Sequence, residues 1–215
     1  MKTFVSFPVV HSRELPGELR EYDVRFSEAS LRAFLEEFSR PGDVVFNPFA
    51  GCGTSNDVAE SMGRVGYGIE YDETKVRYAR SILQYPERLI HGDSRQLASY
   101  QLPACDFSIS SPPFMLKDDI EDPLTAYSKV GAGYEAYLQG IKLVYAQVAD
   151  LMKPGSYAVI EVANLRRDSE VTKLAWDVAA VVEEVLTFER EIIMGWDHHY
   201  YGYDHSYSLV FSRPG

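Results

Sequence analysis

The chain has 215 residues, of which 46% are hydrophobic and 25% charged, and this balance excludes a disordered or fibrous protein. The length suits one domain with a large core, so we expect residues 1–215 to form a single domain. No apolar run approaches the roughly 20 residues that span a bilayer, and no basic-then-apolar leader is visible, so the sequence predicts a cytoplasmic protein. Proteins that bind nucleic acid usually carry a basic patch, so the formal net charge of −11 by itself argues against a nucleic-acid partner.

The predicted elements alternate between strands and helices, which is typical of a parallel α/β sheet. An amphipathic helix over residues 30–38 comes first. Strands are then predicted at 44–49, 65–70, 88–93 and 106–110, with helices at 54–62 and 73–83. The remaining elements are helices at 134–152 and 174–186 and strands at 157–162, 189–196 and 206–211. Residues 115–133 are polar, acidic and without a clear period, and we expect a mobile loop of the length that is often functional.

The turn between the first of these strands and its helix carries a glycine pattern, with Gly51 and Gly53 placed where a backbone can approach a ligand. Glu70 ends the next strand, about 20 residues later, where a carboxylate can accept both hydroxyls of a ribose. Asp93 ends the third strand, and its carboxylate can receive the amino group of an adenine. Asn56 stands where a dinucleotide fingerprint would have its third glycine. Each feature has a purely structural alternative as a turn or a helix cap, but together they predict an adenosine-type cofactor.

Ser111-Pro112-Pro113-Phe114 follows the strand at 106–110, and prolines cannot continue a strand ladder. This tetrapeptide resembles the catalytic signature of the amino-methyltransferases that act on cytosine, adenine, guanine or glutamine amides. Residues 47–54 resemble the cofactor motif of the same family, usually written Asp-Pro-Phe-x-Gly-Ser/Cys-Gly-Thr, with Asn47 in place of the aspartate. The resemblance runs from about Arg25 to the C-terminus.

The resemblance implies a Rossmann-like class I methyltransferase fold, α/β, with a mostly parallel seven-stranded sheet whose last strand is antiparallel. It also implies S-adenosyl-L-methionine as the cofactor. The cofactor-binding residues that it indicates are Asn47, Phe49, Gly51, Gly53, Thr54, Glu70, Asp93 and Ser94, with Arg25 and Phe26 from the upstream element.

An exocyclic amine is a poor nucleophile until acceptors hold its hydrogens. The Ser111 hydroxyl and the Pro112 carbonyl could be these acceptors, with the pair Pro112-Pro113 fixing their direction and Phe114 stacking on the flat target. A serine in the first position is, within the family, most typical of cytosine-directed enzymes. The alternative is that Ser-Pro-Pro is only a turn and the phenylalanine only core.

No separate target-recognition domain is visible, so the loops 115–133 and 197–205 are the candidate substrate-recognition elements. The rings assigned to the substrate are those of Trp196, His198, Tyr200, Tyr201 and His205, which could stack on an unpaired or flipped base. Core packing is the alternative for such rings. We expect no metal site, because the histidines lack a fourth ligand at a recognisable spacing.

The resulting prediction is a cytosine N4-methyltransferase that acts on nucleic acid, with DNA ahead of RNA. Target recognition could come from the two loops, from a second copy of the chain in a homodimer, or from a partner subunit. Three alternatives remain open at this point: an enzyme acting on ribosomal or transfer RNA, methylation of adenine N6, and an inactive cofactor-binding subunit, which the asparagine at position 47 favours.

Overall fold

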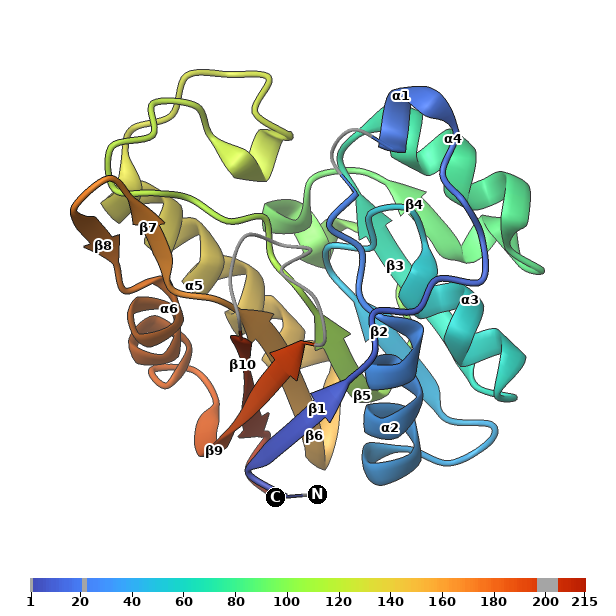
Figure 1. Cartoon of the computed structure of the whole chain (residues 1–215). Helices are drawn as coiled ribbons and strands as arrows, with labels where there is room; N and C mark the ends of the chain where they lie inside the picture. Colours follow the sequence, from blue (N-terminus) through green and yellow to red (C-terminus); the bar gives the residue numbers. More distant parts are fainter. Residues whose placement is uncertain (1, 21–22, 197–204) are drawn as a thin grey trace.

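Eight strands form one mixed sheet within the residues described by the computed structural model, which are 2–20, 23–196 and 205–215 (Figure 1). Their order across the sheet is β1-β9-β10-β6-β5-β2-β3-β4. All neighbouring pairs are parallel except those made by β10, which lies antiparallel between β9 and β6. The strand bounds are β1 Phe4–Phe7, β2 Val44–Asn47, β3 Val65–Glu70, β4 Leu89–His91, β5 Cys105–Ser110, β6 Met152–Val162, β9 Thr187–Trp196 and β10 His205–Ser212.

Helices cover both faces of the sheet, as expected for parallel strands that are buried on both sides (Figure 1). One face packs on α5 and α6 through a core cluster that includes Ile141, Val144 and Val178. The opposite face packs on α2 and α3 through Leu31 and Val58. The helix bounds are α1 Gly17–Arg20, α2 Glu28–Phe38, α3 Thr54–Ser61, α4 Glu73–Ile82, α5 Tyr134–Leu151 and α6 Leu174–Val182, with 3-10 turns η1 Pro86–Arg88, η2 Ser94–Ser99 and η3 Pro123–Thr125.

The observed sheet has one strand more than the seven expected. The additional strand, β1, is only four residues long and pairs with β9 from the far end of the chain, with Phe4 opposite Ile193. A short segment at a sheet edge carries little pattern of its own, and its partner is not visible in the local sequence. A separate two-stranded sheet, β7 (Leu165–Arg167) with β8 (Glu170–Thr172), was also not predicted.

Two predicted strands are shorter in the structure than the sequence indicated. β2 ends at Asn47 instead of residue 49, because the Asn47 side-chain oxygen accepts a hydrogen bond from the Phe49 N–H and turns the chain. β4 begins at Leu89 because η1 precedes it. Within the described ranges, none of the helices has both the length and the apolar character needed to cross a membrane.

Candidate active site

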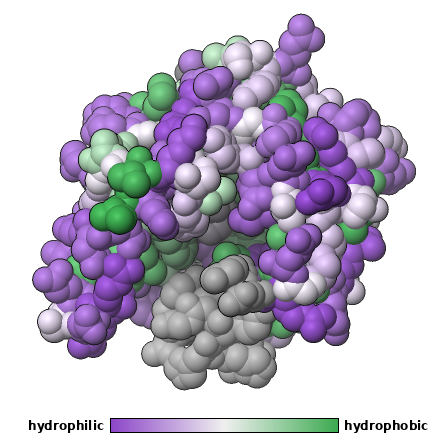
Figure 2. All heavy atoms as spheres, turned by 90° about the horizontal axis from the view of Figure 1, so that it is seen from above, coloured by the Kyte–Doolittle hydropathy of each residue, from purple (hydrophilic) through white to green (hydrophobic). Residues whose placement is uncertain are grey.

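A cavity of about 960 Å³ opens at the carboxyl ends of β2, β3 and β5. The chain runs from β2 outward to β3 and β4 and then returns to β5 on the other side of β2, so the cavity lies where the strand order reverses. Open α/β sheets bind ligands at such a reversal point. Figure 2 looks onto this edge of the molecule, whose surface is largely hydrophilic. The predicted cofactor and catalytic motifs both line the cavity, apart from Gly53.

The glycine loop forms one wall of the cavity through Gly51. Its φ of +56° is in the left-handed region, and a Cβ placed on it would meet nothing within 4 Å. The Gly51 N–H donates to Oε2 of Glu70 at 2.7 Å, and the Asp72 N–H donates to Oε1 of the same carboxylate at 2.8 Å. Glu70 is therefore held rigidly at the cavity wall, with oxygen lone pairs left for a ligand.

Gly53 was predicted to bind the cofactor, and in the structure it packs closely against α4. Its φ is +79°, and a Cβ on it would lie 2.8 Å from the Cβ of Ala79 on α4. A real Cβ does not come so close to another carbon. Gly53 is not among the residues that line the cavity, so its glycine is explained by the close approach of the loop to α4.

Asn47 is buried and both ends of its amide are used inside the protein. Its oxygen accepts from the Phe49 N–H at 2.8 Å, and its nitrogen donates to the Ser55 hydroxyl at 2.8 Å. An aspartate at this position could keep the contact only with the Ser55 hydroxyl as the donor. Phe49 and Thr54 also line the cavity, and Thr54 is the first residue of α3.

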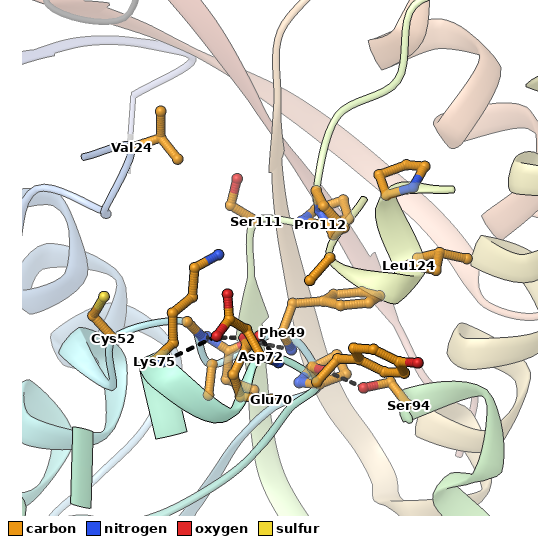
Figure 3. Close-up of a pocket in the computed structure, with 18 of the residues that line it drawn as sticks. Val24, Phe49, Cys52, Glu70, Asp72, Lys75, Ser94, Ser111, Pro112 and Leu124 are labelled. Carbon is orange, nitrogen blue, oxygen red and sulfur yellow. Dashed lines mark hydrogen bonds between the residues drawn. The ribbon is translucent and has the colours of Figure 1, made fainter. Parts of the chain in front are cut away.

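Asp93 and Ser94 lie at the start of η2, beside the loop that follows β2. The Ser94 hydroxyl donates to the Pro48 carbonyl, an interaction drawn in Figure 3. The Asp93 carboxylate accepts from the Arg95 N–H at 2.9 Å and from both Nε and a terminal nitrogen of its guanidinium, at 3.0 and 2.8 Å. Burial opposes the charged form of Asp93, but the hydrogen bonds from Arg95 outweigh it and lower the pKa of this carboxyl. Asp93 is thus an ionised acceptor on the cavity wall.

The predicted cofactor contacts of the upstream element, Arg25 and Phe26, line the cavity. The Arg25 guanidinium forms a forked pair with Asp23, with contacts of 2.8 and 2.7 Å, and also donates to the Arg13 carbonyl at 3.0 Å. Phe26 packs on the core cluster beneath α2. Arg25 and Asp23 therefore form a charge-assisted pair at the cavity wall.

The motif Ser111-Pro112-Pro113-Phe114 follows β5 and lines the cavity with all four residues. The Pro113 carbonyl accepts from the Tyr137 hydroxyl at 2.9 Å, and the Phe114 carbonyl accepts from the Tyr127 hydroxyl at 2.8 Å. Among the described residues, no hydrogen-bond partner reaches the Ser111 hydroxyl or the Pro112 carbonyl. In Figure 3 the Ser111 hydroxyl points away from the Glu70 and Ser94 side chains. Two acceptors are thus left open while the following two carbonyls are fixed by tyrosines.

In the described part of the chain, none of the aromatic residues predicted to meet the substrate lines this cavity. Trp196 lies at the end of β9 and packs on the core cluster beneath α2. His205 is exposed at the start of β10, with its Nε2 3.0 Å from the Tyr207 hydroxyl. Neither residue lines the cavity. His198, Tyr200 and Tyr201 lie outside the described residues.

The predicted loop 115–133 does reach the cavity. It contains η3 and a bridge between Glu121 and Val130. Leu124 and Tyr127 line the cavity, and Leu124 is buried. The Tyr127 side chain is partly exposed, and its hydroxyl donates to the Phe114 carbonyl at 2.8 Å.

Several lining residues were missed by the sequence reasoning. Leu15 and Leu19 come from an N-terminal segment without a motif that would indicate a site, and Val24 directly precedes the predicted contact Arg25. Asp72 caps α4 and Lys75 lies on its first turn, and Figure 3 shows the Lys75 side chain beside Asp72. Both residues follow closely on the end of β3, and this position could have indicated the site, because ligands bind at the carboxyl ends of parallel strands.

Known proteins resemble this chain in a family-specific segment of sequence and in fold. Residues 6–81, which span β1 to most of α4, match the model of the N6/N4 methyltransferase family, described as DNA methylase. The solved structure of TrmN from Thermus thermophilus is similar, with a TM-score of 0.65 and 18% identity over 87% of this chain and 49% of that one. This chain therefore spans about half the length of TrmN.

Two further structures match over nearly their full length. A TehB-like SAM-dependent methyltransferase from Corynebacterium glutamicum has a TM-score of 0.57 and 18% identity, covering 89% of each chain. A SAM-dependent methyltransferase from Methanosarcina mazei has a TM-score of 0.59 and 12% identity, covering 84% of this chain and 97% of that one. At such identities the likeness shows the fold.

The chain has the class I fold of S-adenosylmethionine-dependent methyltransferases, and this prediction is confirmed. The predicted resemblance to the DNA amino-methyltransferases is confirmed over residues 6–81. S-adenosyl-L-methionine is the cofactor of this family and fold.

Proposed function

We propose that this chain transfers a methyl group from S-adenosyl-L-methionine to the exocyclic amine of cytosine in DNA, forming N4-methylcytosine. The observation that carries the proposal is the pair of open acceptors at the Ser111 hydroxyl and the Pro112 carbonyl, beside the ring of Phe114 on the cavity wall. The match of residues 6–81 to a DNA methylase family supports the choice of nucleic acid, and DNA within it.

The arrangement of the motif suits the chemistry of an exocyclic amine. Such an amine gives its lone pair to the ring, and two acceptors that hold its hydrogens favour the pyramidal nitrogen that can attack. Tyr137 and Tyr127 hold the carbonyls of Pro113 and Phe114, so the motif presents its two open acceptors in a fixed direction. When bound, the cofactor supplies an activated methyl group, and the task of the protein is positioning.

The cavity suits the cofactor in both size and lining. Its volume of about 960 Å³ is at the upper end of what small-molecule sites have, which leaves room for a flat base beside a nucleoside. We assign Glu70 to the ribose hydroxyls and Asp93 to the adenine amino group, because both carboxylates are fixed at adjacent strand ends. The bare backbone of Gly51 leaves space for a ligand where a side chain would point.

Access to the base is the remaining requirement. A cytosine in a duplex is paired, so the base must be unpaired or swung out before it can enter the cavity. We propose that the loop 115–133 forms part of the substrate wall, because Leu124 and Tyr127 already line the cavity. The net charge of −11 gives little general attraction for phosphates, so we propose that recognition needs a second copy or a partner subunit.

The test is incubation of the purified chain with methyl-labelled S-adenosylmethionine and separate pools of single-stranded DNA, duplex DNA and RNA. Nucleoside digestion and mass spectrometry should then show N4-methylcytosine from DNA, and on the order of a hundredfold less in the same time with the Ser111→Ala variant. Methyladenine as the product would overturn the base assignment, and a product only from RNA would overturn the polymer. Cofactor binding with no product from any pool would favour a cofactor-binding subunit.

A further inference from the structure

Arg95 contacts both the carboxylate assigned to the cofactor and a carboxylate of the loop 115–133. The guanidinium of Arg95 contacts Asp93 at 2.8 Å through one terminal nitrogen and Asp122 at 3.0 Å through the other. Its Nε also lies 3.0 Å from Asp93. One planar group therefore holds two carboxylates, one on the strand end assigned to the adenine and one in the loop.

Both ends of this link are anchored. The Arg95 carbonyl accepts from the Gln147 side chain on α5 at 3.0 Å, which fixes the backbone that carries the guanidinium. In the loop, the other oxygen of Asp122 accepts the Leu124 N–H at 2.9 Å and caps η3. Asp122 thus sets the position of Leu124, which lines the cavity, although Asp122 itself does not line it.

A second arginine holds the same loop at a different place. Arg167, on β7, pairs with Asp118 and with Asp119, each at 2.8 Å. Arg167 does not contact Asp93 and does not line the cavity. Of these two arginines that pair with carboxylates of the loop, Arg95 also contacts the assigned cofactor residue Asp93.

We propose that Arg95 is a positioning residue that couples cofactor binding at Asp93 to the placement of the loop 115–133 over the cavity. The inference rests on the proposed function, since it takes Asp93 as the adenine acceptor. Arg95 keeps the Asp93 carboxylate oriented for the ligand, and the bound ligand in turn restrains the group that holds Asp122. Coupling of this kind is reciprocal, so fixing the loop strengthens cofactor binding and cofactor binding protects the loop.

The experiment compares the full chain with three variants, Arg95→Met, Asp122→Asn and the matched control Arg167→Met. Affinity for S-adenosylhomocysteine is measured by calorimetry. Protection of the loop is measured as the ratio of trypsin cleavage rates after Lys129, an exposed loop residue, without and with the ligand. Asp122→Asn keeps the oxygen that caps η3 and removes the charge facing Arg95, so it remains a usable test should Arg95→Met fail to fold.

We expect Arg95→Met and Asp122→Asn each to lower the affinity by about fivefold or more and to abolish the protection. Arg167→Met should accelerate cleavage but keep both the affinity and the protection ratio. Unchanged affinity and protection in Arg95→Met and Asp122→Asn would overturn the inference, as would an equal loss in Arg167→Met. Absence of ligand binding by the unmodified chain would instead overturn the proposed function, together with the inference that rests on it.

Discussion

The backbone N–H of Gly51 donates to Oε2 of Glu70 at 2.7 Å, so one carboxylate ties the glycine loop to the end of β3. The other oxygen of Glu70 accepts from Asp72, the residue that caps α4. Glu70 consequently does more than present an acceptor to a ribose. It holds together the two backbone segments between which the cofactor is assigned.

Replacing Glu70 with alanine should lower the affinity for S-adenosylhomocysteine and also lower the melting temperature. The lost charge-assisted bonds to a ribose are worth about 1.5–3 kcal/mol, which corresponds to roughly a 10- to 150-fold change in the dissociation constant. Calorimetry and thermal unfolding measure the two effects. Glu73→Ala, at an exposed position in the first turn of α4, is the control and should leave the affinity unchanged. Unchanged affinity in Glu70→Ala would remove Glu70 from the cofactor site.

Ser111→Ala and Phe114→Ala should reduce turnover while leaving the affinity for S-adenosylhomocysteine close to that of the unmodified protein. Loss of one aligned polar contact in a catalytic site costs on the order of a hundredfold in rate. Steady-state methyl transfer and calorimetry separate the two quantities. A Ser111→Ala variant with full turnover would show that this hydroxyl has no part in the reaction.

Ser110→Ala is the neighbouring control for this experiment. Ser110 is fully buried, and its hydroxyl shares a hydrogen bond of 2.7 Å with the hydroxyl of Tyr145. Its removal leaves the Tyr145 hydroxyl unsatisfied, at a cost of about 1–3 kcal/mol in the free energy of unfolding. Turnover per folded molecule should change much less than in Ser111→Ala.

The two glycines of the loop should respond differently to alanine. Both have positive φ, which strains any residue with a Cβ by about 1–2 kcal/mol. In Gly53→Ala the methyl group also collides with Ala79, so urea unfolding should show the larger loss of stability. In Gly51→Ala the methyl group points into free space on the cavity wall, so ligand affinity should fall more than stability. Equal effects of the two variants on affinity would contradict this division of roles.

A buried carboxyl outside the cavity should make stability depend on pH. Glu161 lies on β6 opposite Ser208 of β10, and the Ser206 hydroxyl donates to its Oε1 at 3.0 Å. Its Oε2 is buried and has no partner in the described part of the chain. Burial raises the pKa of Glu161 to about 7, and the bond from Ser206 offsets only part of this effect. The neutral form is thus the one that the fold accommodates.

Because the folded-state pKa of Glu161 is above the unfolded value, its contribution to stability is complete below about pH 4.5 and is lost as the pH rises to about 7. The loss is on the order of 3 kcal/mol. Glu161→Gln should therefore be more stable than the unmodified protein at pH 8 and similar at pH 4.5, as measured by urea unfolding. Ser206→Ala should deepen the loss at pH 8, since it removes the donor that favours the charged form. A Glu161→Gln variant without any gain at pH 8 would refute this account.

The parallel part of the sheet could be predicted because its strands are apolar runs followed by recognisable turns. The antiparallel last strand was anticipated from the family resemblance, and β10 confirms it. β1 and the β7–β8 hairpin could not be predicted, because strands of three or four residues at an edge owe their existence to partners and not to their own pattern.

The predicted cofactor and catalytic motifs meet because parallel strands bring their carboxyl ends to one edge. The sequence could not separate Gly51 from Gly53, since the difference depends on which of them approaches α4. It also could not show that Asp93 is already paired with Arg95, because that pairing depends on the path of the chain after β4. Aromatic residues near the last strands indicated a stacking surface, but a ring such as that of Trp196 packs equally well on the core.

The residue between the two glycines adds a further consequence. Cys52 lines the cavity, and burial raises the pKa of its thiol to about 11. At pH 7 only about one such side chain in ten thousand is a thiolate. A sulfonium methyl group is an electrophile, and a thiolate would readily attack it. On the proposed function, which places the methyl donor in this cavity, a protonated thiol competes far less than a thiolate would with the incoming amine.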